Sequence, residues 1–161
     1  MAKDLPLIFE AVDRATPDQL KKLSHIHQLA FSHIGQDGWS HEALANSCAA
    51  TGSLLISALR DNQPIGFALF RQVLDEAELI TLAVAPDNQG RSVGSKLLQW
   101  AEDQLRSKDV CTVFLEVRAD NAAAIRLYEN LGFKATSVRK AYYKLAGAGR
   151  VDAVNYAKAL Y

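Results

Sequence analysis

The chain is poor in the features that mark several large classes of protein. It has two cysteines, Cys48 and Cys111, and they form no C-x-x-C motif. Such sparse cysteine favours two buried free thiols over a disulfide, so we expect a reducing, cytoplasmic location. No stretch approaches the roughly 18 uninterrupted apolar residues of a membrane span, and the apolar run near the start is too short for a signal peptide.

An excess of charge of one sign is also missing. Eighteen Lys and Arg residues balance 18 Asp and Glu residues, so no net field attracts nucleic acid or an anionic membrane. The sequence has no repeat, low-complexity tract or linker-like segment that would divide it. With 161 residues, 49% of them hydrophobic, we expect a single domain over residues 1–161 with a substantial core.

Hydrophobic periodicity predicts two helices, three meandering strands, then a helix, a strand, a helix and a closing hairpin. The first helix has a strong start, because Thr16 can cap it, Pro17 suits the first turn and Gln19 completes a capping box. This order predicts an α/β (α+β) fold, with a mixed central β-sheet flanked by helices on both faces and a parallel strand pair within residues 77–117. The expected helices are 16–31, 41–51, 93–107 and a fourth that Asp120 or Asn121 caps and that stops before Gly132. The expected strands are 53–59, 65–74, 77–84, 111–117, 133–143 and 151–160.

The stretch "VAPDNQGRSVGSKLL" has the pattern of a phosphate-binding loop. An apolar strand leads into Gly90, Ser92 and Gly94 and then into a helix, whose free N–H groups and dipole attract an anion. A surface turn without a ligand is the alternative. The P-loop motif is absent, because Lys96 is not followed by Ser or Thr, and the dinucleotide fingerprint G-x-G-x-x-G is absent too.

Two downstream residues have the chemistry of an acid–base pair. Glu116 lies near the end of an apolar strand, on the face of Phe114 and Arg118, where a partly desolvated carboxylate can serve as a base. The alternatives are a solvated strand end or an ion pair with Arg118. Tyr128 shares a helical face with its apolar neighbours and carries a hydroxyl, although a plain core tyrosine is the usual reason for such a residue.

Taken together, these segments resemble the GNAT superfamily of acetyl-CoA-dependent N-acetyltransferases. "LAVAPDNQGRSVGSKLL" is similar to its cofactor motif [Q/R]-x-x-G-x-[G/A], and "NAAAIRLYENLGF" is similar to its N…A…LYE..GF motif. The tail "RKAYYKLAGAGRVDAVNYAKAL" resembles the branch that acetylates the N-terminal alanine of a ribosomal protein. The resemblance covers residues 65–160 well and the first 60 residues loosely.

The resemblance implies where the cosubstrate acetyl-CoA binds. The backbone of the loop would hold its pyrophosphate, the end of the preceding strand would pair with its pantetheine arm, and a splayed sheet would provide the slot. One departure is Ser92, which stands where the family motif has a glycine; its hydroxyl would contact phosphate or cap the helix. The implied cofactor-binding residues are Leu82, Ala83, Val84, Gln89, Gly90, Arg91, Ser92, Val93, Gly94, Ser95 and Asn121.

The resemblance also implies the roles of the acid–base pair and the kind of partner. Glu116 would be the general base and Tyr128 the general acid, and the acceptor would be a peptide or protein N-terminus, as on a ribosomal protein. Trp39, Arg118, Tyr142 and Tyr143 are candidates for the acceptor groove. We expect a monomer or weak dimer, with no direct contact to nucleic acid or membrane.

Three alternatives to this acceptor remain at this point. The chain would acetylate lysine, acetylate a small amine, or bind acetyl-CoA without catalysis. A single carboxylate base suits an α-amine with a pKa near ~8 better than a lysine with a pKa near ~10.4. No set of His, Cys and carboxylate residues has the spacing of a metal site, so we expect no metal.

Overall fold

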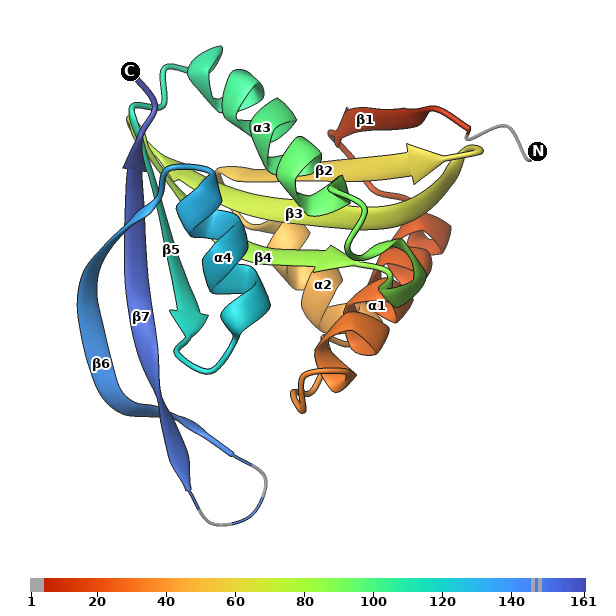
Figure 1. Cartoon of the computed structure of the whole chain (residues 1–161). Helices are drawn as coiled ribbons and strands as arrows, with labels where there is room; N and C mark the ends of the chain where they lie inside the picture. Colours follow the sequence, from red (N-terminus) through yellow and green to blue (C-terminus); the bar gives the residue numbers. More distant parts are fainter. Residues whose placement is uncertain (1–4, 146, 148) are drawn as a thin grey trace.

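Figure 1 shows the chain as a computed structural model, which describes residues 5–145, 147 and 149–161. Within these residues seven strands form one sheet, accompanied by four α-helices and a short 3-10 helix, η1. The elements in chain order are β1 (Leu7–Val12), α1 (Pro17–Ser32), α2 (His41–Ala49), β2 (Ser53–Arg60), β3 (Gln63–Val73), β4 (Glu76–Val84), η1 (Pro86–Asn88), α3 (Val93–Arg106), β5 (Thr112–Arg118), α4 (Ala122–Asn130), β6 (Lys134–Lys144) and β7 (Arg150–Ala159).

The sheet is mixed, as predicted. Its strand order is β1-β2-β3-β4-β5-β7-β6. The pair β4–β5 is parallel and is joined through α3, whereas all other neighbours are antiparallel. Helices α3 and α4 lie on one face and α1 and α2 on the other (Figure 1), which confirms the predicted arrangement of layers.

The first strand, β1, is absent from the sequence-based prediction. It pairs antiparallel with β2 and forms an edge of the sheet. None of its residues is fully buried, so its hydrophobic pattern is weak, and Pro6 directly precedes it. It also makes a long-range packing contact: the centre of the Phe9 ring lies 6.2 Å from that of Trp100 in α3.

The helix N-caps lie where short-range sequence patterns indicate them. The Thr16 hydroxyl accepts a hydrogen bond from the Gln19 N–H at 3.2 Å, and the Gln19 side-chain oxygen accepts one from the Thr16 N–H at 2.9 Å, which completes the predicted capping box. At α4, the Asn121 side chain accepts a hydrogen bond from the Ala124 N–H at 3.2 Å. Helix α2 ends earlier than predicted, at Ala49, because Ala50 is already extended.

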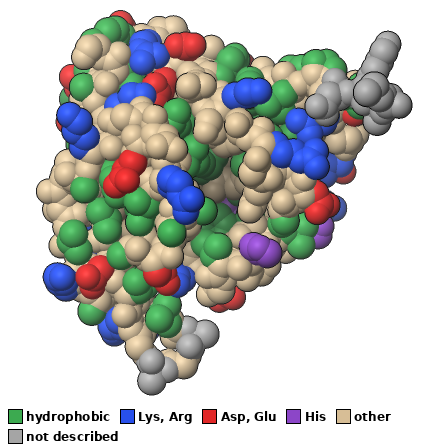
Figure 2. Space-filling view, in the orientation of Figure 1, with side chains coloured by type: hydrophobic (Ala, Val, Ile, Leu, Met, Phe, Trp, Pro, Cys, Tyr) green, Lys and Arg blue, Asp and Glu red, His purple; other side chains and the backbone are tan. Residues whose placement is uncertain are grey.

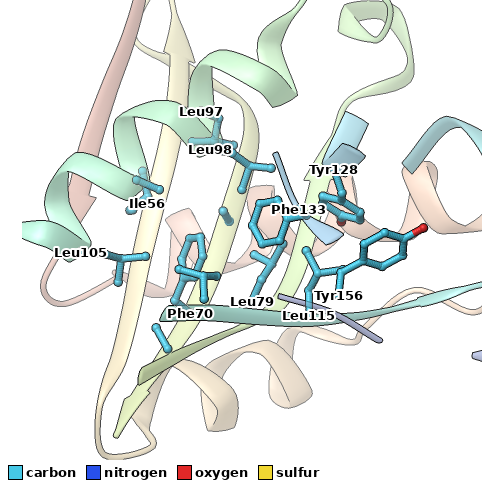
Figure 3. Close-up of a cluster of buried hydrophobic side chains, with 14 of the residues drawn as sticks. Ile56, Phe70, Leu79, Leu97, Leu98, Leu105, Leu115, Tyr128, Phe133 and Tyr156 are labelled. Carbon is cyan, nitrogen blue, oxygen red and sulfur yellow. The ribbon is translucent and has the colours of Figure 1, made fainter. Parts of the chain in front are cut away.

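The core has two parts, one on each face of the sheet. One lies beneath α1 and α2. The other, under α3 and α4, gathers side chains such as Phe70, Leu97, Leu115 and Tyr128 (Figure 3). Burial on both faces fixes the register of the central strands, because a slip by one residue would turn each side chain to the wrong core.

The two cysteines are free, as predicted, but they are not both buried. Cys48 is half-buried and Cys111 is exposed. Cys111 precedes the first residue of β5, where its N–H donates to the Asp75 carbonyl at 2.7 Å. The expectation of two buried thiols was therefore wrong, since the apolar run of β5 begins one residue later.

Candidate active site

A cleft opens in the sheet because β4 and β5 stay paired over only three residues. The pairing joins Glu76–Glu78 to Thr112–Phe114, and beyond it the strands diverge (Figure 1). Ile80 is an extra residue in the register of β4 against β3, and a bulge of this kind bends the strand that carries it. The gap holds a cavity of about 760 Å³, and Figure 2 shows the surface hollowed near the middle of this view.

One wall of the cleft is the free end of β4. Leu82, Ala83 and Val84 line the cavity, with no paired neighbour from β5 at this level. The Val84 carbonyl accepts a hydrogen bond from the Gln89 side-chain amide at 2.9 Å. Gln89 therefore ties the loop back to β4, and its own N–H donates to Pro86.

The loop before α3 forms a cradle of backbone N–H groups, which we define as residues 90–95. The first N–H of this helix with a backbone acceptor in the described chain is that of Lys96, which donates to Ser92 at 3.1 Å. The preceding N–H groups are free to bind an anion. At Gly90, φ is +71° and an added Cβ would meet nothing within 4 Å, so the space beside the loop is open.

Ser92 adopts a backbone conformation that suits the glycine of the family motif. Its φ is +61°, in the left-handed region, and its side chain makes no capping hydrogen bond. The suggestion that its hydroxyl caps the helix was therefore wrong, because the left-handed turn does not bring it to the next N–H groups. Ser92 lines the cavity, as do Val93 and Ser95.

Two other residues of the loop differ in their surroundings. Arg91 is exposed and is not among the residues that line the cavity. Gly94 lines the cavity, but an added Cβ would lie 3.4 Å from Leu127 and 3.9 Å from Val84. A single Cβ at Gly94 would therefore make ordinary van der Waals contacts, whereas a larger side chain would press on Leu127.

Glu116 projects from β5 into the cleft with both carboxylate oxygens near donors. The Tyr143 hydroxyl donates to Oε1 at 3.3 Å, and Arg139 Nε lies 3.3 Å from Oε2. The Glu116 side chain is 20% exposed, so it is accessible from the cavity yet partly desolvated. Sequence reasoning missed Arg139, since nothing in its local sequence separates it from other surface cations.

Arg118 is not the partner of Glu116, so the alternative of an ion pair between them is wrong. The Arg118 guanidinium forms a bidentate ion pair with Asp120, in which Nε donates to Oδ1 at 2.9 Å and Nη2 donates to Oδ2 at 2.8 Å. The Asp120 hydrogen bond raises the pKa of Arg118, and the same bond lowers the pKa of Asp120. Arg118 is buried and lines the cavity beside Asn121, whose side chain is engaged in capping α4.

Tyr128 extends from α4 into the core with its ring 5.8 Å from that of Phe133, in an edge-on arrangement (Figure 3). It is 8% exposed and borders the cavity. Burial raises the pKa of its hydroxyl, which therefore keeps its proton at neutral pH. Tyr128 on α4 and Glu116 on β5 thus line the same cavity.

The candidate acceptor residues divide between two cavities. Tyr143 and Trp39 line the main cavity, from the last hairpin and from the loop after α1. Tyr142 lies apart, half-exposed beside a second hollow of about 400 Å³ that also borders Glu116. The loop of the predicted closing hairpin includes positions 146 and 148, which lie outside the described residues.

A buried histidine, His27 in α1, connects the loop after α1 to β4, and sequence reasoning missed it. His27 Nδ1 accepts the Trp39 N–H at 2.9 Å, so Nε2 carries the proton and donates to the Thr81 hydroxyl at 2.9 Å. The His27 ring stacks on Phe31 at 4.1 Å. Burial lowers the pKa of His27 to about 4, which keeps the ring neutral and this arrangement intact at neutral pH.

The described part of the chain contains no group of three or more His, Cys, Asp or Glu residues that could hold a metal ion. No helix in residues 5–145, 147 and 149–161 is long and apolar enough to cross a membrane.

Comparisons with known proteins agree with this geometry. A model of the Acetyltransferase (GNAT) family matches residues 20–133. The [Ribosomal protein bS18]-alanine N-acetyltransferase of Escherichia coli is 39% identical over 130 residues, covering 81% of this chain and 84% of that protein. The Salmonella typhimurium protein of the same name is 48% identical over 94 residues, but the match spans only 63% of its length and 58% of this chain.

Structure comparison points to the same relatives. The crystal structure of the ribosomal-protein-S18-alanine N-acetyltransferase from Escherichia coli superposes with a TM-score of 0.83 at 35% identity, covering 95% of this chain and 94% of that one. The family model and the superposed structure thus both cover most of the chain, including the segments that form the cleft. The chain belongs to the GNAT acetyltransferase family and is an N-acetyltransferase.

Proposed function

We propose that the chain transfers the acetyl group of acetyl-CoA to the α-amine of a protein N-terminus, with the N-terminal alanine of a small-subunit ribosomal protein as acceptor. The observation that carries the proposal is the cleft itself, which is lined both by the N–H cradle of residues 90–95 and by the carboxylate of Glu116. Relatives named for transfer to the alanine of ribosomal protein bS18 support the acceptor. Such an acceptor is made in the cytoplasm, where we propose the chain acts.

The residues present fit the cosubstrate that the family uses. Acetyl-CoA supplies the acetyl group as a reactive thioester. The free N–H groups of the cradle, at the positive end of α3, suit its pyrophosphate, and Gly90 leaves open space for it. The unpaired end of β4, Leu82–Val84, suits the amide-bearing arm, which can add to it as a strand does.

Glu116 prepares the acceptor. An α-amine has a pKa near ~8, so only about a tenth of it is neutral and nucleophilic at pH 7. Glu116, directly or through a water molecule, takes the proton from the ammonium group and leaves the lone pair free to attack the thioester carbon. Tyr143 and Arg139 each contact one oxygen of Glu116 and hold the carboxylate in a single orientation.

Tyr128 assists departure of the sulfur. As the new C–N bond forms and the C–S bond breaks, negative charge develops on the leaving thiolate. Burial keeps the Tyr128 hydroxyl protonated, so it donates a hydrogen bond to the sulfur and then its proton as the bond breaks. Proton-transfer steps of this kind contribute about 10²–10⁴-fold, and positioning of the two substrates contributes the rest.

The test is a competition between acceptors at saturating acetyl-CoA, followed by mass spectrometry. One peptide has a free N-terminal alanine, a second has a blocked terminus and an internal lysine, and a third sample contains free polyamines. We expect the alanine peptide to be acetylated fastest. Faster reaction of the lysine peptide or of the polyamines would reject the acceptor, and reaction of none would reject catalysis on amines of these kinds.

A further inference from the structure

Strand β6 is irregular beside the active site. Arg139 pairs with Ala153 and Tyr143 pairs with Val151. An advance of four residues along β6 therefore corresponds to only two residues of β7, and β6 contains two extra residues here. The extra residues form a bulge around Ala141, whose φ is +50°. This left-handed conformation is unfavourable for a residue with a Cβ, so something must stabilise it.

Asp152 is the residue of β7 opposite this bulge, and it binds it directly. Its Oδ1 accepts a hydrogen bond from the Ala141 N–H at 2.7 Å. That bond is the main reason why the pKa of Asp152 lies below its ordinary value, so the carboxylate is charged at neutral pH. A hydrogen bond to an ionised carboxylate is among the stronger hydrogen bonds in proteins. On the other side of the same residue, the Arg150 guanidinium donates to the Ala141 carbonyl at 3.3 Å.

The bulge determines what surrounds Glu116. In a regular strand, residues four apart are about 13 Å apart, because each residue adds ~3.3 Å. Here Arg139 and Tyr143 pair with β7 residues that are only two apart in sequence, so the distance between their Cα atoms is about half as large. Both side chains then reach the same carboxylate, at 3.3 Å each.

We propose that Asp152 is a positioning residue, which holds the bulge at Ala141 and thereby keeps Arg139 and Tyr143 on the carboxylate of Glu116. Asp152 acts through the backbone of β6. The inference rests on the proposed function in one respect, that Glu116 receives the proton of the acceptor. It adds that the orientation of the base depends on a carboxylate in another strand.

The first experiment measures kinetics of Asp152→Ala with the N-terminal alanine peptide. We expect kcat/KM for the acceptor to fall by about 10- to 100-fold, since small displacements of a positioned group have effects of this size. The KM for acetyl-CoA should not change, because the cradle belongs to the other side of the cleft. Adding Ala141→Gly should restore most of the loss, because glycine adopts a positive φ without the help of Asp152.

Matched controls separate positioning from a general loss of structure. Asp152→Asn keeps an oxygen that can accept the Ala141 N–H and should retain most of the activity. Lys140→Ala removes only the exposed ion pair with Asp152, at 3.5 Å, and should act like wild type. Wild-type acceptor kinetics in Asp152→Ala, or a loss that Ala141→Gly does not restore, would overturn the proposal.

A second readout does not depend on any acceptor. The pKa of Tyr143 is raised to about 12, first by burial and then by Glu116; Tyr142 raises it further and Arg118 lowers it. The Tyr142 ring contacts the Tyr143 ring edge-on, and Arg139 lies over the Tyr142 ring and pairs with Glu116. In NMR spectra of 13C-tyrosine-labelled protein, its signal should stay constant between about pH 8 and 11. The signal is assigned by its loss in Tyr143→Phe.

In Asp152→Ala the signal of Tyr143 should begin to titrate near the ordinary tyrosine value of about 10. The double variant with Ala141→Gly should return it to the wild-type behaviour. An unchanged Tyr143 signal in folded Asp152→Ala would refute the positioning role. If the wild-type protein fails to acetylate the peptide, the proposed function fails, whereas the tyrosine titration still decides whether Asp152 positions Tyr143.

Discussion

Replacing Ser92 by glycine should stabilise the protein, although it removes a side chain. Ser92 has φ +61° and ψ 16° and makes no capping hydrogen bond, so nothing local offsets its conformation. A left-handed conformation costs a residue with a Cβ about 1–2 kcal/mol. Glycine loses about 0.4–1 kcal/mol through the greater freedom of its unfolded chain. The difference predicts a gain of about 0.5–1 kcal/mol in the free energy of unfolding.

The assay is denaturant unfolding at equilibrium, with a thermal scan in which Tm should rise by about 1–4 °C. Ser95→Gly is the matched control: the same chemical change inside α3 should lower the free energy of unfolding by about 0.5–1 kcal/mol. Gly90→Ala should also lower it, by about 1 kcal/mol, through its φ of +71° alone, because the added Cβ meets nothing within 4 Å. Ser92→Gly that unfolds at a lower denaturant concentration than wild type would refute the reasoning.

The remaining predictions concern the catalytic pair, the cradle and the buried histidine. Glu116→Gln should lower turnover and flatten the rise of rate between about pH 6 and 9, with acetyl-CoA affinity unchanged by calorimetry; a wild-type profile would reject Glu116 as the base. Tyr128→Phe should lower kcat by about 10²-fold or more without a change in acetyl-CoA affinity, and an unchanged kcat would reject its role. Gly94→Val should destabilise the fold and weaken acetyl-CoA binding, because the Cβ alone already contacts Leu127 at 3.4 Å and the two methyl groups beyond it would crowd that side chain; unchanged unfolding and binding would contradict this. The pKa of His27 is about 4 in the folded protein and 6.5 in the unfolded chain. As the pH falls from 6.5 toward 4, the unfolded chain binds a proton that the folded protein does not, so the free energy of unfolding should fall by up to about 3 kcal/mol. His27→Gln should remove that part of the pH dependence, and identical slopes in both proteins would show that His27 does not contribute it.

Much of the fold can be predicted from the sequence, because local signals determine where most elements begin and end. The capping box of Thr16 and Gln19 and the cap at Asn121 are satisfied within three residues along the chain. Strand β1 could not be predicted in this way, because it is recognisable only by its pairing with β2, more than 40 residues away. The weak burial pattern of an edge strand carries little information by itself.

The candidate site shows the same division more sharply. The sequence by itself determined the loop before α3, the strand that carries Glu116 and the helix that carries Tyr128, since each depends on residues close together in the chain. Only the tertiary structure decided that Glu116 meets Arg139 and Tyr143 rather than Arg118, and that the Ala141 bulge brings them there. The physical reason is that these contacts join strands β5, β6 and β7, where register and a two-residue bulge set distances that no periodicity along one strand records.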